Sequence, residues 1–147
     1  MKAAIFVRMA AGLVLLHAVL HTVGGLFGKV PGGPAAVAVA AMKANPFVVF
    51  GNTRTFWDFY MGFGLGVTIF LTMEAVVLWL LAGLTVAYGE KLRPVLTAFA
   101  IGYLLFAVNS YRYFFLGPVV AEVLIAGCLF AAVATARGEA DRGERNA

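Results

Sequence analysis

Ionisable side chains within the apolar stretches of this 147-residue sequence are the first candidates for chemistry, because charge is costly in an apolar environment. His17 and His21 stand four residues apart and therefore share one face of a helix. Such a pair can ligate zinc, iron or haem, and Glu122 could add a carboxylate. The same side chains also suit proton or quinone chemistry, or plain helix-bridging hydrogen bonds to Asn109 or Glu122. The spacing alone leaves these alternatives open.

Depth along the predicted helices brings several of these groups to one level. His21, Asn109 and Glu122 each lie roughly 8–9 Å from the outer end of their helix, at about 1.5 Å per residue. His17 lies one turn deeper, and Asp58 lies at the boundary just above them. We therefore predict one polar pocket near the outer surface. Its predicted residues are His17, His21, Arg54, Trp57, Asp58, Tyr60, Asn109 and Glu122.

Aromatic residues, Trp57 and Tyr60 among them, collect at the same predicted level. The general interpretation is an aromatic belt at a membrane–water interface, and the more specific one is the mouth of a ligand cleft. Arg54 and Asp58 are four residues apart, a spacing that allows an ordinary helical ion pair.

Glu74 does not belong to the predicted pocket. It follows Asp58 by sixteen residues, about 24 Å along a helix, and therefore lies in the inner half of its segment. We expect it to be a protonated packing residue or a partner of Arg8, and the sequence does not decide its role. The single cysteine, Cys128, lies in an apolar run and excludes an internal disulfide.

The composition identifies the environment that must hold these residues. Hydrophobic residues make up 63% of the chain and charged residues 12%, with a mean hydropathy of +0.94. A soluble protein of this composition would lack the polar surface to cover its core. The net charge of +4 forms no patch or stripe, because the basic residues are scattered over the chain ends and loops. This distribution excludes a nucleic-acid-binding surface.

Four apolar segments are long enough to cross a membrane, at residues 3–27, 56–86, 94–113 and 119–136. The predicted fold is therefore an all-α integral membrane four-helix bundle over residues 1–136, followed by a charged cytoplasmic tail at 137–147. The outer loop, 28–55, contains an Ala-rich stretch at 35–45 that is too short to span and predicts an interfacial helix. A signal peptide is the alternative for the first segment, but the two histidines and the absence of a small-residue cleavage site disfavour it.

Basic residues predict the orientation of the bundle. Six lie on the side of the two termini and four on the other, which places both termini in the cytoplasm of a multi-pass inner-membrane protein. The six are Lys2, Lys91, Arg93, Arg137, Arg142 and Arg145, and the four are Lys29, Lys43, Arg54 and Arg112. Gly62 and Gly66 share a helical face where backbones can approach closely, so this face predicts packing against a neighbouring helix or a second copy of the chain.

Two motifs carry a resemblance to known proteins. The strings HTVGG at 21–25 and NTRTFWDFYMGFGL at 52–65 fit the pattern HTxGG … RTxWDFYxGFG. In these motifs the chain resembles a group of small, uncharacterised four-span bacterial integral membrane proteins. The resemblance covers the first two segments and the loop between them. It implies a topology, and it implies that His21, Arg54, Trp57, Asp58 and Tyr60 belong to one site.

The leading hypothesis is a small integral membrane protein whose outer-leaflet polar pocket binds a lipid-like or other small hydrophobic ligand. One alternative is an intramembrane redox or isomerase enzyme, with haem, a metal or a quinone at His17, His21 and Glu122. Another is a structural subunit of a larger membrane complex. The expected partners are the lipid bilayer, the ligand and a second copy through Gly62 and Gly66. The sequence identifies neither the ligand nor a cofactor, and it leaves catalysis undecided.

Overall fold

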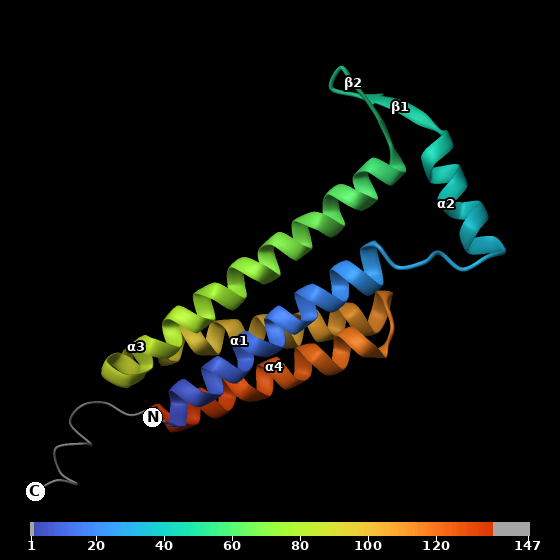
Figure 1. Cartoon of the computed structure of the whole chain (residues 1–147). Coiled ribbons are helices and arrows are strands. Elements are labelled where there is room, and N and C mark those ends of the chain that lie inside the picture. Colours follow the sequence, from blue (N-terminus) through green and yellow to red (C-terminus); the bar gives the residue numbers. More distant parts are fainter. Residues whose placement is uncertain (1, 137–147) are drawn as a thin grey trace, which may run out of the picture. The chain divides into compact units, whose positions relative to one another are not determined.

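The structure, a computed structural model, describes residues 2–136, so the predicted tail at 137–147 lies outside the described residues. Helices account for most of it, which confirms the all-α class, and a short β-hairpin that was not predicted lies in the first loop (Figure 1). The elements are α1 (Lys2–Leu20), the π-helix η1 (His21–Leu26), α2 (Pro34–Ala44), β1 (Pro46–Val49), β2 (Asn52–Thr55), α3 (Phe56–Tyr113) and α4 (Leu116–Thr135).

The chain divides into two compact units, which are described separately below. The core unit consists of residues 1–17 and 71–147, of which 2–17 and 71–136 are described. The loop unit consists of residues 18–70. The boundaries fall within α1 and near the middle of the first half of α3, so each of these helices contributes residues to both units.

Helix α3 is two helices joined at Tyr88, whose φ of −123° and ψ of 28° are not helical. The predicted segments 56–86 and 94–113 left a gap between them, and the second segment was expected to begin at Pro94. Instead, the second arm of α3 is already helical at residue 89. Glu90, Lys91 and Leu92 are good helix formers, so their polarity does not interrupt the helix.

The start of α4 also lies earlier than expected, at Leu116 rather than at 119. Gly117 and Pro118 were interpreted as part of a turn. Proline is tolerated in the first turn of a helix, because the N–H groups there have no intrahelical acceptor. Pro118 therefore occupies a position where its missing donor costs nothing.

The buried face of the core unit is lined mainly by small residues at helical spacing. Its apolar members are Ala3, Ala4, Val7, Ala10, Ala11 and Val14 of α1, Leu71, Ala75, Leu78, Ala82, Leu96, Ala100, Tyr103 and Ala107 of α3, and Ile125, Ala126, Leu129 and Ala132 of α4. Larger apolar side chains point outward, as Leu80 at 64% and Leu105 at 66% exposure illustrate. Small residues inside and large apolar residues outside are typical of helices that pack within lipid.

Polar side chains join consecutive helical segments of the core unit. The Arg8 guanidinium of α1 lies 5.5 Å from the centre of the Trp79 ring in the first arm of α3. Tyr103 Oη in the second arm donates to Glu74 Oε2 in the first arm at 2.7 Å. The expected partner of Glu74 was Arg8. In the structure, Glu74 instead accepts a hydrogen bond from the Tyr103 hydroxyl, and Arg8 contacts the Trp79 ring.

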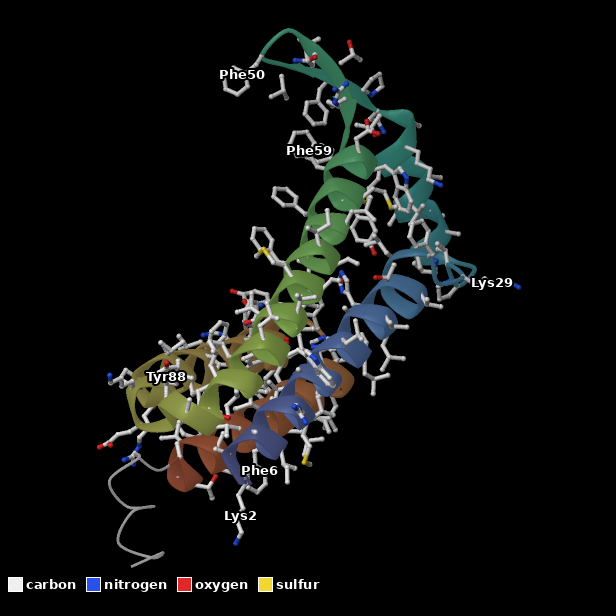
Figure 2. All side chains as sticks on the ribbon, turned by 60° about the vertical axis from the view of Figure 1, so that its left-hand side comes forward. Lys2, Phe6, Lys29, Phe50, Phe59 and Tyr88 are labelled. Carbon is white, nitrogen blue, oxygen red and sulfur yellow. The ribbon has the colours of Figure 1, made fainter. Side chains whose placement is uncertain are left out.

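The β-hairpin of the loop unit pairs β1 and β2 in an antiparallel register, Pro46 with Thr55 and Val49 with Asn52. Phe50 and Gly51 form its two-residue turn, both with positive φ (46° and 78°), as a type I′ turn requires. Phe50 is fully exposed at the tip and points away from the hairpin (Figure 2). The hairpin brings the chain back from the end of α2 to the start of α3.

Candidate ligand-binding site

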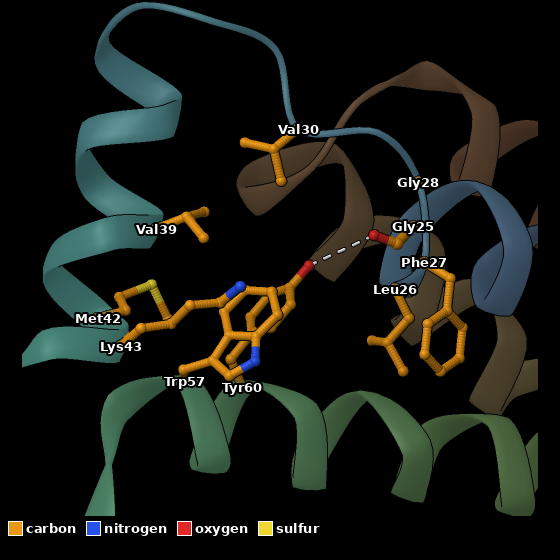
Figure 3. A pocket seen from close by; sticks show the side chains of 10 residues that line it. All are labelled: Gly25, Leu26, Phe27, Gly28, Val30, Val39, Met42, Lys43, Trp57 and Tyr60. Atoms are coloured by element: carbon orange, nitrogen blue, oxygen red, sulfur yellow. Dashed lines mark hydrogen bonds between the residues drawn. The ribbon is translucent and has the colours of Figure 1, made fainter.

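A cleft of about 360 Å³ lies within the loop unit, between residues 25–30, the C-terminal half of α2 and the first turns of α3 (Figure 3). Its volume is within the range of roughly 300–1,000 Å³ that is usual for small-molecule sites. The lining residues are Gly25, Leu26, Phe27, Gly28, Val30, Val39, Met42, Lys43, Trp57 and Tyr60. Most of them are apolar or aromatic, and Lys43 is the one charged group among them.

Two aromatic rings and a lysine form one side of the cleft. Trp57 and Tyr60 are three residues apart on α3 and therefore lie on one face, with ring centres 5.2 Å apart and planes 26° apart. The Lys43 ammonium lies 4.3 Å from the centre of the Trp57 ring, at cation–π distance. Tyr60 Oη donates a long hydrogen bond of 3.5 Å to the carbonyl of Gly25.

The face of α2 that lines the cleft is a single helical stripe. Val39, Met42 and Lys43 stand three and four residues apart, so their side chains share one side of the helix. The hairpin then places this stripe opposite Trp57, although Lys43 and Trp57 are separated by an entire strand pair.

A capping box starts α3 and holds Trp57 in place. Asp58 Oδ2 accepts hydrogen bonds from the Thr55 backbone N–H at 2.7 Å and from Thr55 Oγ1 at 2.9 Å, and the Asp58 N–H donates to Thr55 Oγ1 at 3.2 Å. Residues at the N-cap and at the third helical position satisfy each other's backbone donors in this way. Arg54 was expected to pair with Asp58, but its guanidinium donates to the Thr53 carbonyl at 2.7 Å.

Close contacts between η1 and α3 form the end of the cleft next to Leu26. His21 Nε2 lies 3.1 Å from the Gly64 carbonyl, and Thr22 Oγ1 lies 2.9 Å from Thr68 Oγ1. A Cβ atom at Gly64 would overlap the Leu26 side chain, which would have to shift to make room for it. Because a carbonyl oxygen only accepts hydrogen bonds, His21 Nε2 is the donor of this hydrogen bond.

Gly28 allows the chain to leave η1 towards the cleft. A Cβ atom at Gly28 would overlap the Gly24 carbonyl, so the exit from η1 is possible only without a side chain there. The Phe27 N–H donates to the Thr22 carbonyl at 2.9 Å and closes the π-type turn. The HTVGG motif therefore has a conformational role.

The predicted site residues are distributed over both units. In the loop unit, Trp57 and Tyr60 line the cleft, while His21, Arg54 and Asp58 make the local hydrogen bonds described above. A single pocket that joins this group to His17, Asn109 and Glu122 of the core unit stays a prediction. Within residues 2–136, no group of three or more His, Cys, Asp or Glu side chains could hold a metal ion.

In the core unit, Glu122 is buried at 4% exposure and accepts a hydrogen bond from Ser110 Oγ at 2.9 Å. Asn109, which was predicted to share a pocket with Glu122, is exposed. Adjacent helical residues point about 100° apart, so turning Ser110 inward turns Asn109 outward. The second carboxyl oxygen of Glu122 is buried and makes no hydrogen bond within the described residues.

Lys43 and the apolar residues of the cleft were absent from the sequence-based prediction. The signal for the α2 side was the i, i+3, i+4 spacing of Val39, Met42 and Lys43 in an otherwise alanine-rich helix. The signal for the 25–30 side was the density of glycine around Leu26 and Phe27.

Comparison with family models found no match to this chain. A search of curated proteins and a search of solved structures likewise found no similar protein.

Proposed function

We propose that this chain is a four-span integral membrane protein whose loop unit binds a lipid-like or other small hydrophobic molecule at the outer face. Three described helices, Lys2–Leu26, Phe56–Tyr113 and Leu116–Thr135, are long and apolar enough to cross a membrane. Only 39%, 22% and 28% of their most apolar windows is buried within the protein. Such large exposed apolar faces are what a lipid environment requires and an aqueous one disfavours.

The break at Tyr88 supports a fourth crossing, because it divides α3 into two arms that each exceed the ~30 Å hydrocarbon core. Residues 56–87 extend over roughly 48 Å at about 1.5 Å per residue. The first arm therefore has several turns more than it needs to cross. We assign the surplus to its N-terminal end, where Trp57 and Tyr60 suit the membrane–water interface.

The observation that carries the binding proposal is the composition of the cleft. Aliphatic and aromatic side chains from three segments surround it, and the Lys43 ammonium, the Tyr60 hydroxyl and the Trp57 indole N–H supply its polar side-chain atoms. A mostly apolar pocket with a few directed polar groups is the usual form of a small-molecule site. At a membrane interface, the molecules with matching chemistry are lipids and other amphiphiles.

The proposal is tested by mass spectrometry of molecules that co-purify with the protein in mild detergent. We expect a bound hydrophobic molecule that Trp57→Ala reduces about thirtyfold or more, because a large aromatic contact in a binding site is worth about 2 kcal/mol or more. Trp79→Ala is the matched control, since Trp79 belongs to the core unit and lies beside Arg8. Equal retention in both variants would contradict a binding site at Trp57.

A further inference from the structure

The loop unit carries an excess of positive charge that its own side chains do not neutralise. Residues 18–70 contain three basic residues, Lys29, Lys43 and Arg54, and a single carboxylate, Asp58. The Asp58 carboxylate is engaged by Thr55 in the capping box at the start of α3. No carboxylate of this unit is therefore left to pair with Lys43.

Lys43 is the only one of these cations that lines the cleft. Its ammonium lies on the Trp57 ring and, within the described residues, makes no hydrogen bond or ion pair, so its N–H donors are open to a ligand. A cation–π contact at an exposed site is worth only about 0.5–1 kcal/mol and does not replace an anionic partner. Lys29, by contrast, extends away from the loop unit into solvent (Figure 2).

Tyr60 supplies a second donor on the same side of the cleft. Its hydroxyl hydrogen bond to the Gly25 carbonyl is 3.5 Å long, whereas a good O–H···O bond measures about 2.7–2.8 Å. Breaking this weak hydrogen bond costs little free energy, so the Tyr60 hydroxyl can rotate towards a stronger acceptor. An anionic oxygen is such an acceptor, because charge-assisted hydrogen bonds are roughly twice as strong as neutral ones.

We infer that the ligand of this cleft is a single-chain amphiphile with an anionic head, which Lys43 and Tyr60 bind while Leu26, Phe27, Val30 and Val39 contact its chain. This inference rests on the proposed function and specifies the class of its ligand. A cationic head is disfavoured because Lys43 already occupies the Trp57 face and repels a second cation. A two-chain lipid is disfavoured because about 360 Å³ is near the lower end for small-molecule sites.

The test uses the protein in nanodiscs of zwitterionic lipid, in a Trp79→Phe background that leaves Trp57 as the sole tryptophan. The probes are a fatty acid brominated in its chain, the methyl ester of that acid, and a trimethylammonium amphiphile with the same brominated chain, because bromine quenches tryptophan on contact. Measurements at alkaline pH keep the carboxyl group of the fatty acid ionised. A fourth arm adds phosphatidylglycerol with brominated chains to the disc.

We expect the acid to quench Trp57 with an affinity about tenfold above that of the ester, the size of one hydrogen bond to a charged group. Lys43→Gln should reduce the affinity for the acid to the affinity for the ester. The affinity for the ester itself should not change. Lys29→Gln, which also removes one positive charge but outside the cleft, should change neither the affinity for the acid nor the affinity for the ester. The trimethylammonium probe should bind most weakly, and brominated phosphatidylglycerol should quench less than the fatty acid.

The outcomes separate the inference from the proposed function. Equal affinity for acid and ester would overturn the anionic head while leaving a hydrophobic site at Trp57. A preference for the acid that survives Lys43→Gln would overturn the role of Lys43, and equal quenching by phosphatidylglycerol would overturn the single-chain limit. If no probe quenched Trp57, the proposed binding site would be contradicted, and the inference about its ligand would fail with it.

Discussion

Single residues decide how the loop unit closes on itself. Gly64 admits Leu26, whereas Gly62 and Gly66, on the neighbouring positions of the same helix, have no atom of the described residues within 4 Å of an added Cβ. Gly62 and Gly66 were the glycines expected to permit close packing. Within this chain that role belongs to Gly64, and the open face at Gly62 and Gly66 stays available for the predicted contact with a second copy.

Gly64→Ala should therefore destabilise the protein by about 1–3 kcal/mol, the usual cost of overpacking. Gly62→Ala on the same helix should be neutral or stabilise it by up to about 1 kcal/mol through helix propensity. Thermal unfolding in detergent measures both. Combining Gly64→Ala with Leu26→Ala should cost less than the sum of the single changes, and strict additivity would disprove the contact.

The buried Glu122 carboxyl provides a second comparison between adjacent residues. Ser110→Ala removes its hydrogen-bond donor and should cost about 1–3 kcal/mol, because a buried acceptor is left unsatisfied. Asn109→Ala, at the exposed neighbouring position, should change stability by less than about 0.5 kcal/mol. Chemical denaturation in mixed micelles distinguishes the two. A larger effect of Asn109→Ala would mean that Asn109, and not Ser110, is the partner of Glu122.

At the scale of elements, the N-terminus of α3 connects the hairpin to the cleft. The capping box determines where the helix begins, and the beginning of the helix determines where Trp57 and Tyr60 project. Phe47 of β1 lies 4.8 Å from Phe56 and 5.8 Å from Phe59 between ring centres, which joins the hairpin to this first turn. The cleft therefore depends on the register between hairpin and helix.

Asp58→Ala removes the carboxylate half of the capping box, and it should increase amide hydrogen exchange in the first turn of α3. The same variant should weaken ligand binding without changing which probes bind, because Asp58 positions Trp57 from outside the cleft lining. Asp58→Asn retains an N-terminal hydrogen-bond acceptor and is the control. A change in probe preference with Asp58→Ala would instead make Asp58 a ligand contact.

At the scale of the whole molecule, the distribution of small and large apolar residues defines the environment. The core unit buries alanine-rich faces and presents leucine, isoleucine and phenylalanine outward. Association of helices in lipid depends on close packing, because the apolar medium gives no hydrophobic driving force between them. The bias of basic residues predicts the orientation of the proposed bundle.

Reporter fusions test this orientation directly. A fusion after Arg137 should report the cytoplasm, and fusions within residues 31–45 should report the outside, because six basic residues lie on the terminus side and four on the other. A fusion at Tyr88, in the break of α3, should also report the cytoplasm if each arm crosses the membrane once. Opposite signals would invert the bundle and place the cleft on the inner face.

The sequence by itself determined the helical class, the apolar segments and the short helix in the first loop. Each of these depends on local properties, namely the length of an apolar run and the position of residues such as Pro46. The Thr55–Asp58 capping box is equally local, since it needs only residues three apart, but only the Arg54–Asp58 spacing was interpreted.

The tertiary structure alone decided which side chains meet. Membrane helices are apolar on every side, so their sequences carry little information about rotation around the helix axis, and Ser110 could not be preferred to Asn109 from the pattern. Lys43 reaches Trp57 only because a type I′ turn at Phe50 and Gly51 reverses the chain between them. Contacts of this kind depend on helix rotation and strand register, and both are set by packing between segments distant in the sequence.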